Sequence, residues 1–557
     1  MGTRVFIPFG EFLPDRKLFG NEGLLQAFGV TPAGPNYLST PPIERLITNF
    51  GSHYYGLHIH QTFESGLRKS YAYAGDETRL WEIDYEAATP TLTNKSGTSA
   101  PYSFLSSPPL DAELWMFTSF GENIVATNFN DPVQFLATTA TANFADMITS
   151  TFKPQGRFAF AVRQNLFLAY CFLPSTFDDI ASGTHPQLVV WSQNDNIQVF
   201  GSEAVDTSHI GAGYQQFVGG DLGPITATHG AGDFGLIFLA GGIVRIDGPP
   251  YEFRVIVRGD TTLYPYSVFQ LGDDVYYWGA GGPSVLRNGE GPSRRLGIGK
   301  IQRSLLDNTT GFGDDFARRA SLGAREVSGG ADPANQLARW AYRPMDTANL
   351  TNDTGGAKAY LMIDYAITEE RFTVSKCPTI ETPTTIIEQE VELQFQRQEP
   401  AKEAAIWGPF GSLFGIAFAG PSLGTFSQTL ARFNLDHDEG QVPGIQLRTA
   451  FGRLSDTRGS RIVAVRPVWS NTEGQAANIE GATSIQVHTK NKPWEDETDS
   501  SIHTVFNEDG WIGTDSTVVG SYHSVTLKFA ATNSAINEIH EIEGLEIEFV
   551  EGAEYGS

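Results

Sequence analysis

The sequence predicts an all-β protein whose main part is a β-propeller of six to eight blades. Between residues 110 and 289 one pattern recurs: a short apolar strand, a turn rich in Gly and Asp, and a second short strand. It appears at residues 114–126, 158–170, 232–238 and 271–278. Such a unit has too little apolar area to bury one face alone, so it becomes stable by stacking on the next unit. The 557 residues include 59 Gly, 30 Pro, 38 Phe and 19 Tyr, with only 18% charged residues, a composition typical of short strands and tight turns rather than of a helical bundle.

The rest of the chain is expected to flank this propeller. Residues 1–50 carry several prolines among scattered glycines, which predicts an extended N-terminal arm lying on a neighbouring subunit. Residues 51–467 form the propeller, with weaker units at 56–83, 336–372 and 413–434. A long segment near residues 290–335 is expected to protrude, with short helical candidates at 298–306 and 316–322. Residues 468–557 contain longer alternating strands, at 484–488, 521–529 and 541–549, which predict a small C-terminal β-sandwich.

Charge and cysteine content limit the functions that the chain can have. Lys and Arg number 38 against 64 Asp and Glu, a net charge of -26, so the surface as a whole repels nucleic acid and anionic membranes. Sequence-specific DNA binding is therefore not expected, although DNA could pass such a surface without adhering. Cys171 and Cys377 lie far apart in mostly apolar surroundings, which favours two buried thiols over a disulfide. Neither a signal peptide nor an apolar run of membrane-spanning length is evident, so we expect a soluble protein.

Several sequence runs, taken in order, resemble one family. The central one is His185-Pro186-Gln187-Leu188-Val189-Val190-Trp191-Ser192-Gln193-Asn194-Asp195, followed by residues 225–227, 243–246 and 268–276. Further matches lie at residues 124–128 with Pro132, at 449–467, and at 520–523. Together these runs resemble the β-propeller tail nozzle proteins of short-tailed bacteriophages, a family that includes packaged-DNA stabilisation and head-completion proteins. The resemblance covers most of the chain in order.

The resemblance implies a mechanical role without catalytic residues or cofactors. Nozzle subunits form a ring, usually a homohexamer, below the portal and its adaptor. The channel of the ring retains the packaged genome and later releases it. Expected partners are further copies of the chain, the portal-adaptor protein, tail fibre, spike or tip proteins, and genomic DNA that passes without sequence-specific binding. The expected location is the virion tail, assembled in the host cytoplasm.

One basic cluster stands out in this acidic chain: Arg294, Arg295, Lys300 and Arg303. It is either a solvated face or a patch that forms salt bridges with an acidic neighbour in the ring, or it is a patch that touches phosphate or docks on the adaptor. We favour contact with a neighbouring protein.

An enzymatic or glycan-binding propeller of the phage tail is the alternative. The carboxylate pairs Asp178-Asp179, Asp273-Asp274 and Asp314-Asp315 are adjacent in sequence, so on a strand they would point to opposite faces and could not flank one glycosidic bond. Residues 420–424 match Gly-x-Ser-x-Gly by letter, but a β-turn fits them better than a nucleophile elbow. Glycan binding needs exposed aromatic side chains, whereas Trp81, Trp278 and Trp340 are expected to pack between blades.

Two short motifs could hold a structural metal, and the sequence leaves this open. His58 and His60 would lie on one face of a strand, as metal ligands can, but no further ligand follows at the required spacing. Asp436 and Asp438 resemble part of a calcium loop that lacks its third carboxylate and its distant Glu. Surface or inter-subunit histidines and a solvated turn are the simpler interpretations.

Overall fold

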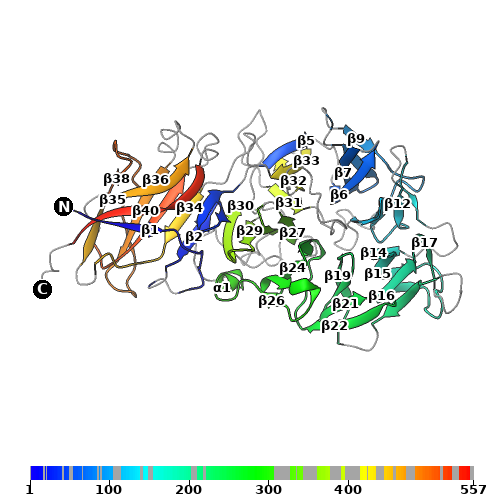
Figure 1. Ribbon diagram of the computed structural model, residues 1–557. Helices are drawn as coiled ribbons and strands as arrows, with labels where there is room; N and C mark the ends of the chain where they lie inside the picture. Colours follow the sequence, from blue (N-terminus) through cyan, green and yellow to red (C-terminus); the bar gives the residue numbers. More distant parts are fainter. Residues whose placement is uncertain are drawn as a thin grey trace.

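The computed structural model describes residues 2–16, 19, 22–40, 43–48, 54–64, 67–84, 87, 91–103, 115–137, 142–147, 155–201, 210–217, 221–306, 327–333, 335–342, 361–376, 391–395, 414–422, 425–433, 445–455, 459–471, 483–514, 519–529 and 539–551. Over these residues the chain is almost entirely β, in eight sheets (Figure 1). The prediction of an all-β fold built from many small antiparallel sheets is confirmed.

Seven groups of strands follow one another through the middle of the chain, each with four or five strands and antiparallel pairing throughout. The first is β6 (Tyr54–Glu64), β7 (Leu67–Asp76), β8 (Leu80–Asp84) and β9 (Thr91–Asn94). The second is β10 (Met116–Phe120), β11 (Asn123–Thr127), β12 (Gln134–Leu136) and β13 (Ala145–Asp146). The third is β14 (Gln155–Val162), β15 (Asn165–Leu173), β16 (Gly183–Gln193), β17 (Asn196–Phe200) and β18 (Gly213–Gln216).

The remaining four groups continue the same plan. The fourth is β19 (Ile225–Gly230), β20 (Gly235–Leu239), β21 (Gly242–Asp247) and β22 (Glu252–Arg258). The fifth is β23 (Phe269–Leu271), β24 (Asp274–Gly279), β25 (Gly282–Leu286) and β26 (Arg294–Arg295), with short 3-10 turns η1 (Pro265–Ser267) and η2 (Arg287–Gly289). The sixth is β27 (Val327–Asp332), β28 (Leu337–Tyr342), β29 (Leu361–Ala366) and β30 (Arg371–Lys376). The seventh is β31 (Val391–Phe395), β32 (Phe414–Ser422) and β33 (Thr425–Phe433), completed by β5 (Ile43–Thr48) from near the N-terminus.

The Gly/Asp turns produce the hairpins that the sequence predicted. Gly121 joins β10 to β11 and Gly272 joins β23 to β24, both with φ of +62°. A side chain at either position would meet no atom within 4 Å, so the requirement for glycine comes from the left-handed backbone alone.

Consecutive sheets stack face to face and bury apolar side chains between them. Ile124 and Leu80 pack between the first and second sheets, Val125 and Leu168 between the second and third, and Val275 with Phe238 between the fourth and fifth. The first strands β6, β10, β14 and β19 lie beside one another in that order, and β31 lies beside both β27 and β6. Each sheet therefore gains its stability from its neighbours, as expected for small repeated units.

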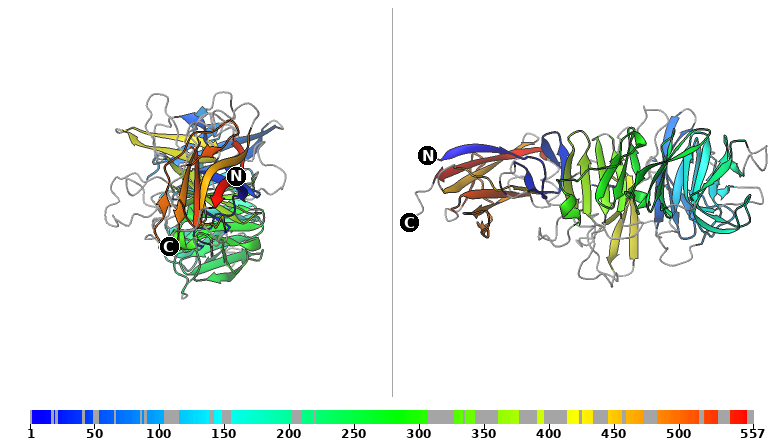
Figure 2. Two further views of the ribbon diagram at one scale, coloured as in Figure 1. Left: turned by 90° about the vertical axis from the view of Figure 1, so that its left-hand side faces the viewer. Right: turned by 90° about the horizontal axis from the view of Figure 1, so that it is seen from below.

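A β-sandwich extends from this part of the molecule (Figure 2). One of its sheets contains β1 (Thr3–Pro8), β3 (Val30–Ala33), β4 (Asn36–Ser39), β40 (Ile539–Glu551), β35 (Ser460–Asn471) and β38 (Ile512–Gly513). The other contains β2 (Leu24–Phe28), β34 (Ile445–Thr449), β39 (Tyr522–Phe529), β36 (Thr483–Lys490) and β37 (Thr498–Asp499). Along β40, Leu545, Ile547 and Phe549 are buried, which matches the predicted alternation.

The N-terminal segment differs from the extended arm that we expected over residues 1–50. Four of its strands belong to the chain's own sandwich, and β5 completes the seventh small sheet. Apolar side chains between the prolines explain the difference, because Phe9, Phe12, Leu24 and Tyr37 are each at most 2% exposed in the sandwich core. In the C-terminal part of the chain, the sandwich strands begin at β34, earlier than the predicted residue 468. Prolines at strand edges and ends are compatible with these short strands.

The segment near residues 290–335 packs closely where it is described. The one α-helix of the described residues, α1 (Gln302–Leu306), is shorter than the predicted helix over 298–306. Leu296, Ile301 and Leu305 are buried against the fifth and sixth sheets, so residues 294–306 do not protrude. The second predicted helix, 316–322, and Cys377 lie outside the described residues. Cys171 is a buried free thiol, as predicted.

A single sheet runs from the sixth group of strands into the sandwich. Its nine strands have the order β27-β28-β29-β30-β2-β34-β39-β36-β37. The transition is a parallel contact in which Phe28 of β2 pairs with Val374 of β30. One hydrophobic cluster accompanies it, from Trp278 and Trp340 in the small sheets to Leu447 and Ile547 in the sandwich. Because the interface is continuous and apolar, we expect the two parts to behave as one stiff body.

Candidate functional site

The predicted basic cluster lies at the junction between the fifth and sixth sheets and the N-terminal segment. Arg294 forms two hydrogen bonds with the Glu370 carboxylate, from Nη1 and Nη2, each 2.8 Å long. The Lys300 ammonium lies 2.5 Å from the Glu11 carboxylate and also donates to the Glu370 carbonyl. The structure therefore brings Arg294 and Lys300 together, with carboxylates of the same chain as partners.

Arg295 and Arg303 are placed differently. The Arg295 Nε lies 3.4 Å from Asp260 Oδ2, within the edge of the fifth sheet. Arg303 contributes its backbone N–H, which donates to Asp15 Oδ2 at 2.6 Å, and Ser304 donates to Asp15 Oδ1 from its N–H and its hydroxyl. The Asp15 carboxylate thus binds the N-terminal end of α1 and ties the N-terminal segment to it.

We call Arg294, Lys300, Glu370, Glu11 and Asp15 the ionic clasp. Sequence reasoning found its two cations and missed its three carboxylates, since Glu370 lies 76 residues from Arg294 and the other two lie near the N-terminus. The hydrogen bonds from Arg294 hold the pKa of Glu370 below its usual range. The pair is partly open to water, with side-chain exposures of 50% and 39%, so its contribution to stability is screened and amounts to less than about 1 kcal/mol.

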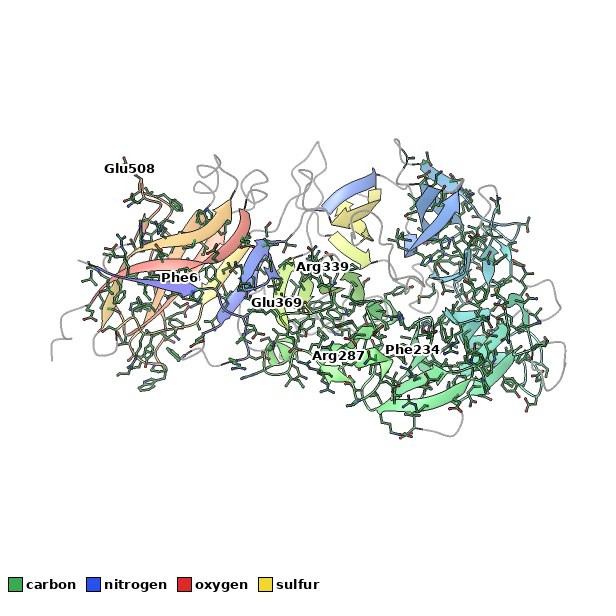
Figure 3. The ribbon with its side chains drawn as sticks, viewed as in Figure 1. Phe6, Phe234, Arg287, Arg339, Glu369 and Glu508 are labelled. Atoms are coloured by element: carbon green, nitrogen blue, oxygen red, sulfur yellow. The ribbon has the colours of Figure 1, made fainter. Side chains whose placement is uncertain are left out.

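A buried ion pair lies beside the clasp. Arg339 on β28 and Asp364 on β29 approach to 3.2 Å, with exposures of 0% and 2%. Thr31 on β3 donates its hydroxyl to Asp364 Oδ2 at 2.9 Å, which links the pair to the sandwich. Burial raises the pKa of Asp364. Figure 3 shows Arg287, Arg339 and Glu369 on the part of the small-sheet body that faces the sandwich.

Arg371 adds a second polar link across the same junction. Its Nη1 donates to the Gly34 carbonyl at 2.7 Å and its Nη2 donates to the Gly10 carbonyl at 3.0 Å. The guanidinium lies over the ring of Tyr37, 4.5 Å from its centroid, and the Tyr37 hydroxyl donates to the same Gly10 carbonyl. Burial raises the pKa of Tyr37 to about 12, so the hydroxyl keeps its proton. These contacts join β30 to the turns that flank β1 and β4.

Reversing the charges of the basic cluster tests what it contacts. In Arg294→Glu with Arg295→Glu, carboxylates would face Glu370 and Asp260 within the same chain. We expect the free energy of unfolding to fall by about 1 to 2 kcal/mol, measured by urea denaturation. DNA affinity should not change, because the cations are already paired with carboxylates. A drop in DNA binding at unchanged stability would show instead that the cluster binds DNA phosphate groups.

His58 and His60 lie on one face of β6, as the spacing predicted, and both are buried. Their rings converge on one hydroxyl: His58 Nε2 lies 2.8 Å and His60 Nδ1 3.0 Å from Ser119 Oγ on β10. No third His, Cys or carboxylate joins them among the described residues. The two histidines therefore join the first two sheets, and nothing in this arrangement favours a metal. Asp436 and Asp438 lie outside the described residues.

Acid should destabilise the protein through its buried histidines. Burial lowers the pKa of His60 and of His523 from 6.5 to about 4. Between pH 6.5 and 4, these two imidazoles are therefore protonated in the unfolded chain and neutral in the folded chain. Stability that is present above pH 6.5 is lost as the pH falls through this window, by roughly 3 kcal/mol for each histidine.

Denaturation curves between pH 7 and 4 measure this loss. We expect a flatter profile for His60→Asn, in which the amide nitrogen can replace Nδ1 toward Ser119, and for His523→Gln. His185→Gln, at a half-buried position outside these contacts, is the matched control. Identical profiles for all three variants and the unchanged chain would contradict the assignment.

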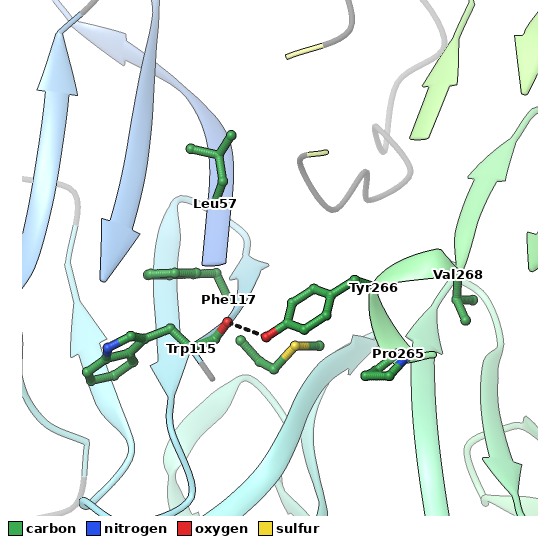
Figure 4. A pocket seen from close by; sticks show the side chains of 7 residues that line it. Leu57, Trp115, Phe117, Pro265, Tyr266 and Val268 are labelled. Carbon is green, nitrogen blue, oxygen red and sulfur yellow. Dashed lines mark hydrogen bonds between the residues drawn. The ribbon is translucent and has the colours of Figure 1, made fainter. Parts of the chain in front are cut away.

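The first strands of the first and second sheets meet the turn η1, which precedes the fifth sheet, at a narrow pocket (Figure 4). It is lined by Leu57, Trp115, Met116, Phe117, Pro265, Tyr266 and Val268. The Tyr266 hydroxyl, from η1 before the fifth sheet, donates to the Trp115 carbonyl beside the second sheet at 3.2 Å. The first and second sheets thus meet the turn before the fifth sheet at this pocket.

The described carboxylate pairs lie in or beside turns, with Asp274 at the start of β24. Asp179 accepts a hydrogen bond from the Tyr214 hydroxyl, and Asp274 accepts from the Asn288 N–H and pairs with Arg287. Asp314 and Asp315 lie outside the described residues. Residues 420–422 end β32, and Ser422 pairs with Thr425 of the antiparallel strand β33, so a strand and not a helix follows.

Comparisons with known proteins leave the family open. No protein-family model and no curated protein matches the chain. Among solved structures it is similar to an extracellular domain from B. thetaiotaomicron (9% identity, TM-score 0.29, 75% of this chain and 53% of that one). It is also similar to the N-terminal domain of Nup159 (8% identity, TM-score 0.27, 90% and 98%) and to Kluyveromyces lactis Hsv2p (10%, 0.24, 57% and 97%). Likenesses this weak carry no argument about function. In the described part of the chain, no helix has the length and apolar character needed to cross a membrane.

Proposed function

We propose that this protein is a structural subunit of a short-tailed bacteriophage tail, which forms a ring with its own copies and acts as the nozzle below the portal and adaptor. The sequence runs around His185 to Asp195 support the family. The observation that carries the proposal is the junction, where a nine-stranded sheet and one hydrophobic cluster make the chain a single stiff body. A ring that retains a pressurised genome needs subunits that do not bend between their parts.

We further infer that the seven small sheets close into a seven-bladed propeller. The contact of β31 with β6 supports closure, since it places the last group of strands beside the first. In this arrangement β5, from the N-terminal segment, supplies the outer strand of the seventh blade. A blade completed by both ends of the repeated region would hold the propeller of one subunit closed.

The DNA channel of this proposal lies between copies and not within one propeller. Tyr266 and Trp115 lie where the first and second sheets meet the turn before the fifth sheet, and the hydrogen bond between them bridges these sheets. A net charge of -26 suits a channel wall along which phosphates must slide. The ionic clasp supports this view, because Arg294 and Lys300 are paired with Glu370 and Glu11 of the same chain.

Assembly on purified connectors tests the proposal. The chain is mixed with portal-adaptor complexes and imaged by electron microscopy, with the chain alone as a reference. We expect a ring, homohexameric as in the family it resembles, that continues the portal channel in the virion tail and binds fibre, spike or tip proteins at its far end. A chain that stays monomeric beside intact connectors would overturn it.

The alternative of a tail propeller that binds host glycan has one specific observation in its favour. Trp494 in the sandwich is 79% exposed, with the Lys492 ammonium 6.0 Å from its ring, and such a surface ring can stack on a sugar. Trp278 and Trp340 are buried between sheets, as predicted, whereas Trp81 is half-buried and donates its Nε1 hydrogen to Asp76. A glycan array with the intact protein and with Trp494→Ala separates the two functions: binding that Trp494→Ala abolishes, without ring assembly, would favour the alternative.

A further inference from the structure

A histidine and two carboxylates converge on the outer edge of the sandwich, away from the junction. His488 on β36 and Asp499 on β37 are cross-strand partners, and Glu497 precedes β37. The His488 Nδ1 lies 2.7 Å from Asp499 Oδ1 and 3.9 Å from Glu497 Oε1. One donor atom from each of the three residues lies within 4.8 Å of the others, a grouping found once in the described part of the chain.

Each of two ligands is held from behind by a second contact. The His488 Nε2 lies 2.8 Å from the Thr526 hydroxyl on β39, and Glu497 Oε2 accepts a hydrogen bond from Arg448 Nη2 at 2.8 Å. Arg448 is itself fixed by a bond from its Nε to the Ser524 hydroxyl. Such outer partners orient the first ligands of metal sites. They leave the His488 Nδ1 and Glu497 Oε1 directed to the same place.

The exposure of the three side chains suits a site that opens to water. His488 is 6% exposed, whereas Glu497 and Asp499 are 36% and 45% exposed. When the Nε2 hydrogen donates to Thr526, the Nδ1 lone pair faces the two carboxylates. A positive ion between them offsets the repulsion in this tautomer, whereas in the other tautomer the Nδ1 hydrogen is donated to Asp499 Oδ1 and Nε2 accepts from the Thr526 hydroxyl. The open side leaves room for water or for a group from another molecule.

We propose that His488, Glu497 and Asp499 form a divalent-cation site in the sandwich. One imidazole nitrogen and two carboxylate oxygens match the ligand set of Zn²⁺ and similar transition metals, with further positions left to water. Calcium, which prefers oxygen ligands alone, fits less well. The ion would link β36 to the segment that carries β37. This inference is independent of the proposed tail function.

Calorimetric titration of the full-length chain, after chelation and dialysis, tests the site with Zn²⁺ as the probe. We expect one equivalent to bind. Asp499→Asn and Glu497→Gln should each weaken binding about 10-fold or more, and His488→Gln should weaken it most. Glu495→Gln, in the same segment but paired with Lys492 at 3.3 Å, is the matched control and should bind like the unchanged chain.

A second probe protects the test against variants that fold poorly. Bound Co²⁺ should give a visible absorption band that His488→Gln removes. Thr526→Val, which touches no ion, should weaken Zn²⁺ binding about 10-fold because it frees the imidazole to turn. Equal Zn²⁺ affinity in the unchanged chain and in folded Glu497→Gln and Asp499→Asn would mean an adventitious ion only and would overturn the proposal, as would the absence of any stoichiometric binding.

Discussion

Deleting residues 1–40 is expected to destroy the sandwich rather than merely to weaken assembly. The deletion removes β2, which lies between β30 and β34 in the nine-stranded sheet, and β1, β3 and β4 from the other sheet. It also removes the buried side chains of Phe9, Phe12, Leu24 and Tyr37. Burying one such side chain contributes roughly 1.5 to 3 kcal/mol, so the loss is comparable with the 5 to 15 kcal/mol that typically stabilise a protein.

Thermal unfolding and limited proteolysis measure this effect. We expect the truncated chain to lose its cooperative transition for the sandwich and to become sensitive to protease over residues 445–551. Phe12→Ala offers a milder version, with an expected loss of about 3 to 5 kcal/mol. Arg4→Ala is the control, because the side chain of Arg4 is 66% exposed on β1. A truncated chain that melts like the full chain and fails only to assemble would favour the predicted extended arm over a folded N-terminal segment.

The small sheets could be predicted because their signal is local. In each hairpin the two short strands and the turn with its glycine, Gly121 or Gly272, lie within about a dozen residues. The strand pattern and the turn residues therefore suffice to predict the hairpin. The alternation of Leu545, Ile547 and Phe549 predicted a sandwich strand for the same reason.

The junction could not be predicted because its contacts are non-local. The pairing of β2 with β30 rests on one parallel contact between Phe28 and Val374. No alternation of apolar residues in the sequence predicts this contact. The prolines of residues 1–50 suggested an extended arm, whereas burial of Phe12 and Tyr37 decided the fold. Likewise, the spacing of Arg294 and Lys300 revealed a basic cluster but not its partners Glu370 and Glu11.

Removing the buried cation of the junction should be the most damaging single substitution of a charged residue. In Arg339→Met, the Asp364 carboxylate stays buried without its partner, and Asp332 nearby raises the cost further. Breaking a buried pair in this way costs about 3 to 5 kcal/mol of unfolding free energy. Arg294→Met is the matched control, since the exposed pair with Glu370 should cost less than about 1 kcal/mol.

The double variant Arg339→Met with Asp364→Asn separates the buried charge from loss of packing. An asparagine at position 364 can still accept the Thr31 hydrogen bond, while it carries no charge. We therefore expect the double variant to regain more than half of the lost stability, measured by urea denaturation at pH 7.

Acid should partly rescue the single variant, because burial already raises the pKa of Asp364 and loss of Arg339 raises it further. As the pH falls below neutrality, protonation of the buried carboxyl removes the uncompensated charge, and the gap between Arg339→Met and the unchanged chain should narrow. A gap that is constant from pH 7 to 5, with no recovery in the double variant, would assign the damage to lost packing of the Arg339 side chain. Recovery both in the double variant and at low pH would instead show that the buried charge of Asp364 causes the damage. The junction would then depend on the neutralisation of Asp364 by Arg339, in a pair that Thr31 links to β3.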